Sequence, residues 1–129
     1  MLFRSIPRAG ADDDFGRTLA IAGSGDVFAI GAPGEDGSAL GIGGDQLSNA
    51  APDSGAVYAF ERPQMTWRQA SYVKATNTEA GDAFGRALAL SGDGATLLVG
   101  APDEDGGGAG FGGDPDDNSV PGSGALYLY

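Results

Sequence analysis

The fold of this chain is decided by the stretch DAFGRALAL at residues 82–90, which continues through a Gly/Asp turn to LLVGAP at residues 97–102. Matching stretches occur earlier, DFGRTLAI at residues 14–21 and FAIGAP at residues 28–33. Each copy contains a Phe-Gly pair near its start. The residues that follow predict a strand with alternating apolar residues, a tight turn and a second strand that ends in Gly-Ala-Pro. The chain therefore contains two copies of one structural unit.

One register aligns the two copies along their whole length. It places Phe15 on Phe84, an offset of 69 residues, and needs no insertion or deletion. The long loops and the later strands match in the same register, including Glu35 with Glu104. A period of this length, with four strands in each unit, is typical of propellers and solenoids.

Apolar and alternating segments locate the strands. In the first unit we expect strands at residues 2–6, 16–22, 27–30, 56–60 and 67–74, with a long loop at residues 34–54. Segments such as residues 97–99 and 126–129 are apolar on both faces, whereas a sheet with one face in water alternates with polar residues. A sheet buried on both faces is what a propeller blade between two other blades requires.

Glycine and acidic residues dominate the composition. The 24 glycines among 129 residues fall at repeated positions between apolar strands, so they indicate turns and close backbone contacts rather than disorder. The net charge is −11, from 18 acidic and 7 basic residues. Such a surface repels phosphate backbones and anionic membranes, which argues against nucleic acid as a partner. An acidic surface can bind divalent cations or basic partners, or it can simply keep the protein soluble.

Two residue types are missing altogether. The sequence has no cysteine and no histidine, which excludes disulfides, thiolate metal sites and imidazole chemistry. Its first residues lack the apolar core of a signal peptide, and no apolar run is long enough to span a membrane. We therefore expect no membrane insertion.

These motifs resemble the FG-GAP repeat of integrin α-subunit propellers, in the form found in bacterial surface proteins. The likeness rests on Phe-Gly at residues 15–16 and 84–85, Gly-Ala-Pro at 31–33 and 100–102, and Gly-x-Val/Leu-Tyr at 55–58 and 124–127. Trp67 and the Tyr-Val-Lys-Ala segment at residues 72–75 are similar to the segments that lead into each repeat of the bacterial proteins. The resemblance covers nearly the whole chain.

The resemblance implies an all-β fold of two antiparallel, four-stranded propeller blades. The first repeat would be residues 1–69 and the second residues 70–129, whose blade lacks its last strand. The expected blade-packing residues are Phe15, Gly16, Gly31, Pro33, Phe84, Gly85, Gly100 and Pro102. The resemblance also implies adhesion or recognition of a protein or glycan ligand at an extracellular surface, without catalysis.

Two blades alone would expose an apolar face at each end, which a soluble monomer rarely does. We expect a homo-oligomeric ring of three or four chains, in which residues 2–6 of one copy complete the second blade of the next. A piece cut from a longer propeller, or an engineered minimal propeller with no ligand of its own, is the alternative.

Calcium is the cofactor that the acidic loops could hold. The calcium loop of integrin blades does not carry over, because only Asp93 occupies a ligand position in the two short turns. The long loops repeat three pairs of acidic residues that could surround a cation: Glu35 and Glu104, Asp36 and Asp105, Asp45 and Asp114. Alternatively, these side chains cap Asx turns and leave their charge in water.

Carboxylates before the Phe-Gly strands are the remaining chemical candidates. Asp12, Asp13, Asp14 and Asp82 could supply an acid–base pair for a hydrolase, or could form a solvated turn. Without histidine a common serine triad is excluded. Arg17 and Arg86 recur in the register, and we expect them to pair with Asp14, Asp82 or other nearby acids.

Overall fold

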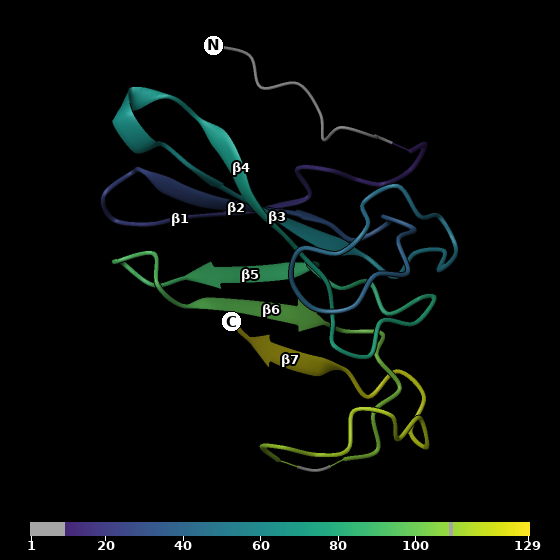
Figure 1. Cartoon of the computed structure of the whole chain (residues 1–129). Helices are drawn as coiled ribbons and strands as arrows, with labels where there is room; N and C mark the ends of the chain where they lie inside the picture. The colour runs from purple at the N-terminus through teal and green to yellow at the C-terminus, as the bar shows by residue number, and fades with distance from the viewer. Residues whose placement is uncertain (1–9, 109) are drawn as a thin grey trace.

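The computed structural model describes residues 10–108 and 110–129. The strand predicted at residues 2–6 lies outside the described residues. No helix in the described part of the chain is long and apolar enough to cross a membrane. The chain folds into two antiparallel sheets that lie one above the other (Figure 1).

The first sheet has the strand order β1-β2-β3-β4. Its strands are β1 (Thr18–Ile21), β2 (Val27–Ala32), β3 (Ala56–Glu61) and β4 (Arg68–Val73). A short 3-10 helix, η1 (Pro63–Met65), joins β3 to β4. These four strands confirm the segments predicted from the alternating pattern. The predicted boundary between residues 69 and 70 falls within β4.

The second sheet has the order β5-β6-β7 and repeats the first sheet in register. Its strands are β5 (Ala87–Leu90), β6 (Leu97–Ala101) and β7 (Ala125–Leu128). Leu19 pairs with Ile30 in the first sheet, and Leu88 pairs with Val99 in the second. Since each pair maps onto the other at the offset of 69, the sequence repeat is also a structural repeat.

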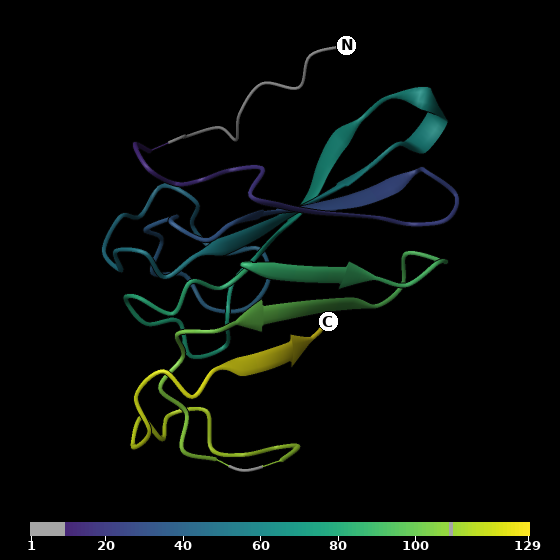
Figure 2. The same ribbon diagram turned by 180° about the vertical axis from the view of Figure 1, so that it is seen from behind.

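The two sheets stack in the same orientation, and β5 contacts both β1 and β2. Figures 1 and 2 show the β1–β2 and β5–β6 turns at one side of the stack and the long loops at the other. Each sheet therefore presents the same pair of faces in the same order.

The main core lies between the sheets. The first sheet supplies Ala29, Val57 and Val73, and the second unit supplies Phe84, Leu97, Val99 and Ala101, all of them buried. Leu88, Leu90, Tyr127 and Tyr129 pack against this cluster from the second unit. Burial of this apolar surface is the main stabilising contribution to the contact between the sheets.

Hydrogen bonds between the two units hold the sheets close together where glycines allow it. The Thr18 hydroxyl donates to the Gly85 carbonyl oxygen at 2.6 Å, and Phe84 N donates to the Ser54 carbonyl oxygen at 3.0 Å. A Cβ at Gly31 would clash with the Gly85 oxygen, so only glycine fits at this crossing. The ring of Phe84 packs edge-on against Tyr127, with centroids 5.3 Å apart.

Val99→Ala tests the packing between the sheets. Val99 is fully buried in β6, so removing its two methyl groups should lower the free energy of unfolding by about 2 kcal/mol. Val120→Ala is the matched control, because Val120 is about half exposed and should change the free energy by less than about 0.5 kcal/mol. Urea unfolding followed by circular dichroism at one protein concentration measures both. Equal losses for the two variants would contradict a core at this position.

Candidate functional site

The outer face of the first sheet is apolar and uncovered. Leu19 and Ile21 of β1 are 69% and 65% exposed. In the register they correspond to Leu88 and Leu90 of β5, which pack in the core between the sheets. The first sheet therefore exposes the surface that the second sheet buries.

The outer face of the second sheet shows the reverse relation. Leu126 and Leu128 of β7 are 68% and 67% exposed, whereas Val57, which corresponds to Leu126, is fully buried beneath the second sheet. Pro102 is exposed on this side, and its counterpart Pro33 is buried. The second sheet therefore exposes the surface that the first sheet buries.

A shallow hollow of about 570 Å³ lies on this outer face. It is lined by Arg86, Ala87, Gly100, Ala101, Pro102, Gly124, Ala125 and Leu126. The matching positions of the first sheet include Thr18, Gly31 and Gly55, which contact Phe84 and Gly85 of the second unit. The hollow therefore corresponds to the place on the first sheet against which Phe84 and Gly85 pack.

A buried polar cluster closes the outer edge of the first sheet. Lys74 Nζ lies 3.0 Å from Glu35 Oε2, and the side chains of both residues are almost fully buried. The Tyr72 hydroxyl donates to Glu35 Oε1 at 3.0 Å, and Lys74 Nζ donates to Ser54 Oγ at 2.7 Å. Burial lowers the pKa of Lys74, while the neighbouring charge of Glu35 acts against that change. The cluster ties the long loop to β4.

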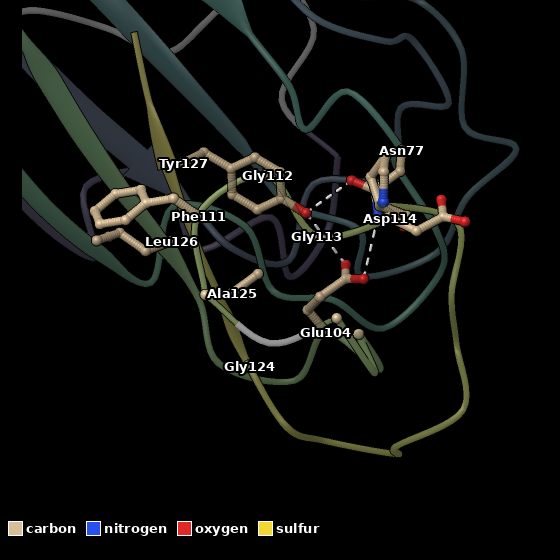
Figure 3. A pocket seen from close by; sticks show the side chains of 14 residues that line it. Asn77, Glu104, Phe111, Gly112, Gly113, Asp114, Gly124, Ala125, Leu126 and Tyr127 are labelled. Carbon is tan, nitrogen blue, oxygen red and sulfur yellow. Dashed lines mark hydrogen bonds between the residues drawn. The ribbon is translucent and has the colours of Figure 1, made fainter.

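The matching glutamate of the second unit has different partners. Asn77 Nδ2 donates to Glu104 Oε1 at 3.1 Å, and the Tyr127 hydroxyl lies 3.3 Å from Glu104 Oε2 (Figure 3). Tyr127 also donates to Asn77 Oδ1 at 2.7 Å. These three residues border a pocket of about 450 Å³. None of the ion pairs formed between described residues includes Glu104.

Glu104 is a buried carboxyl that has no cation beside it among residues 10–108 and 110–129. Burial raises its pKa, and the nearby charge of Asp82 raises it further, with a smaller contribution from Glu79. The hydrogen bonds from Asn77 and Tyr127 act in the opposite direction. This carboxyl therefore takes up a proton more readily in the folded chain than in the unfolded chain.

The acidic residues predicted as calcium ligands accept hydrogen bonds from the protein. Apart from Glu35 and Glu104, the acceptors are Asp36 from Asp53 N, Asp45 from Leu47 N, Asp105 from Gly122 N and Asp114 from Asp116 N. Asp45 and Asp114 form Asx turns, as the alternative interpretation expects. Across residues 10–108 and 110–129 no group of three or more acidic side chains is placed to hold a metal. Calcium binding at these loops stays a prediction.

The other predicted charged residues lie in separate environments. Asp14 is exposed and pairs with Arg17, whereas Asp82 is buried and accepts from Glu79 N. Arg86 pairs with Asp103 at 3.5 Å rather than with Asp82. Asp93 caps the β5–β6 turn through Ser91 Oγ and Ala95 N.

The sequence patterns predict no role for Lys74, Ser54 or Asn77. Ser54 recurs as Ser123, and Ser123 Oγ also bonds the backbone of the long loop, so the repeat itself carried that signal. Lys74 is a charged residue at the end of an apolar strand, where burial demands a counter-charge. Asn77 matches no like residue in the first unit, and only the structure identifies its contacts.

Lys74→Met should lower the free energy of unfolding by about 3 kcal/mol or more, because it leaves Glu35 charged, buried and unpaired. Adding Glu35→Gln should recover most of that loss. Arg68→Met is the control, since Arg68 and Glu61 form an exposed pair worth about 1 kcal/mol at most. Urea unfolding of the wild type, Lys74→Met, the double variant and Arg68→Met measures these free energies. A double variant no more stable than Lys74→Met would contradict the pairing of Lys74 with Glu35.

The raised pKa of Glu104 predicts a pH dependence of stability. Above its ordinary value of about 4.5 the unfolded chain loses this proton first, so stability falls as the pH rises toward the raised folded value. As the pH rises above about 4.5, Glu104→Gln should therefore lose less stability than the wild type. Asp116→Asn, at an exposed acid of the same loop, should follow the wild type. Thermal melting across this range measures the difference, and parallel curves for all three would refute it.

Comparison with known proteins gives one match. The family model of the FG-GAP repeat matches residues 67–129, which include all of β4 and the second sheet. Searches of the curated proteins and of the solved structures find no match to the chain. The FG-GAP repeat is a unit of β-propeller-type modules. Its motifs also occur in the first unit, at an offset of 69 residues. Residues 67–129 are therefore similar to the FG-GAP repeat.

Proposed function

We propose that the protein is a non-catalytic β-propeller interaction module that assembles head to tail with copies of itself. The outer face of the second sheet in one copy would pack on the outer face of the first sheet in the next. Phe15 and Gly16 would then occupy the hollow beside Leu126, as Phe84 and Gly85 occupy the matching place in the first sheet.

The observation that carries this proposal is the reciprocal exposure of equivalent residues. Leu19 and Ile21 are exposed while Leu88 and Leu90 are packed, and Leu126 is exposed while its counterpart Val57 is buried. The contact between the two sheets is thus a template for a contact between copies. An exposed apolar surface at both ends of the stack favours association in water.

Head-to-tail contacts between unlike faces close into a ring when the rotation between units allows it. With two sheets per chain, three or four copies would give about six or eight blades, within the range that propellers use. The long acidic loops gather on one side of the stack (Figure 1), where they would form a continuous surface for a protein or glycan ligand. The resemblance to the FG-GAP repeat supports a role in recognition at an extracellular surface.

Mass in solution tests the assembly. We expect light scattering and native mass spectrometry to find complexes of three or four chains at micromolar concentration. Ile21→Lys and Leu128→Lys should each reduce assembly, because either substitution charges one outer face. Leu40→Lys should not, since Leu40 is an exposed loop residue outside both faces. A wild-type chain that stays monomeric would refute self-assembly and favour a piece of a longer propeller.

Mixing the two face variants tests the direction of the contact. A chain with Ile21→Lys keeps the outer face of its second sheet, and a chain with Leu128→Lys keeps that of its first. Each variant alone should be monomeric, and an equal mixture should stop at a heterodimer. A mixture that stays monomeric, or variants that form dimers alone, would contradict head-to-tail packing.

A further inference from the structure

We propose that the folded chain forms an amide bond between two of its own side chains, the amine of Lys74 and the carboxyl of Glu35. The bond would link the long loop covalently to the residue that directly follows β4. This activity goes beyond the proposed function, because each chain reacts once with itself and needs no partner. It can therefore hold or fail whether or not the chains assemble.

The two reacting groups are in contact and shielded from water. Lys74 Nζ lies 3.0 Å from Glu35 Oε2, and the two side chains are 0% and 5% exposed. Lys74 Nζ also donates to Ser54 Oγ at 2.7 Å, and Ser54 is buried as well, so the amine is held in one position. Groups held together in this way react without the entropic cost of bringing two molecules together.

Burial favours the neutral forms that the reaction requires. It lowers the pKa of Lys74, although the charge of Glu35 acts against that change. Transfer of one proton along the 3.0 Å contact converts the ion pair into an amine and a carboxylic acid, and a dry site penalises neutral groups far less than charged ones. Burial also raises the pKa of Asp13, and the charge of Glu35 raises it further, so a second carboxyl near the pair holds a proton more readily.

Neighbouring donors are placed to stabilise the charge that develops during attack. The Tyr72 hydroxyl donates to Glu35 Oε1 and Gly37 N donates to Glu35 Oε2, both at 3.0 Å. Negative charge builds up on these oxygens when the amine attacks Cδ, and donors at this distance stabilise a tetrahedral intermediate. Burial raises the pKa of Tyr72, so its hydroxyl keeps the proton that it donates.

The atoms of this reaction balance without any added reagent. A bond forms between Lys74 Nζ and Glu35 Cδ, and the bond between Cδ and Oε2 breaks. Of the three hydrogens on the ammonium group, one stays on the amide nitrogen and two leave with Oε2 as water. No oxidant is consumed, so a chain without cysteine would gain a cross-link that reducing conditions do not open.

Mass spectrometry of the full chain tests the proposal. After incubation in neutral buffer, we expect the wild type to be lighter than its sequence by one water molecule. Trypsin should then release residues 18–68 joined to residues 69–86, uncut after Lys74, with the link at Glu35. Lys74→Arg is the matched control, because a guanidinium group keeps the cation but does not release a proton to become a nucleophile. This variant should keep the full mass of its sequence.

The rate of water loss tests the part played by the donors. A time course begins when chain purified unfolded in urea is diluted into buffer and refolds. Tyr72→Phe should slow the reaction about a hundredfold, because it removes one donor to the attacked carboxyl. Tyr127→Phe, which removes a hydroxyl from the second unit, should react as fast as the wild type.

Three results would overturn the proposal. They are a wild type that keeps the mass of its sequence, a lighter chain without joined peptides, and loss of water by Lys74→Arg. The joined peptides matter because Asp-Gly pairs such as Asp36–Gly37 also lose water when they close a succinimide ring. If Lys74→Arg does not fold, the peptides of the wild type still decide. The urea comparison of Lys74→Met refers to wild type that still has its full mass.

Discussion

The close crossing of Phe84–Gly85 over the first sheet is the contact on which the rest of the structure depends. It brings the backbone of the second unit within hydrogen-bonding distance of Thr18 and Ser54, and it fixes the relative position of the sheets. Gly31 permits this approach, since any side chain there would strike the Gly85 oxygen. Once the backbones are this close, the apolar side chains of β2, β5 and β6 pack together in the core between the sheets.

Much of the fold could be predicted from the sequence because local patterns determine it. Alternating apolar residues located β1 and β5, Gly/Asp turns located the hairpins, and the offset of 69 predicted that the second sheet repeats the first. The exposure of Leu19 and the burial of Leu88 could not be predicted from these patterns. Both residues occupy the same place in one motif, and only the order of stacking decides which of them is covered.

The polar clusters were harder to predict because their members are far apart in the chain. Glu35 is one of several acids in a loop, and its partner Lys74 lies 39 residues away, directly after β4. Loop acids normally stay in water, and burial of this one depends on how the loop folds back over the strand edge. The difference between Glu35 and Glu104 is likewise invisible in the repeat, since the same residue has a cation in one unit and an amide in the other.

The shared orientation of the sheets has a consequence for how such chains can grow. One face of the first sheet packs on the opposite face of the second sheet, and both sheets have the same orientation. A tandem gene duplication can therefore add a blade without disturbing those already in place. Drift then becomes constrained in pairs: a bulkier residue on one surface must be matched by a smaller one on the opposite surface of the neighbouring copy. The long loops lie to one side of the stack, so a change of sequence in them does not carry this requirement.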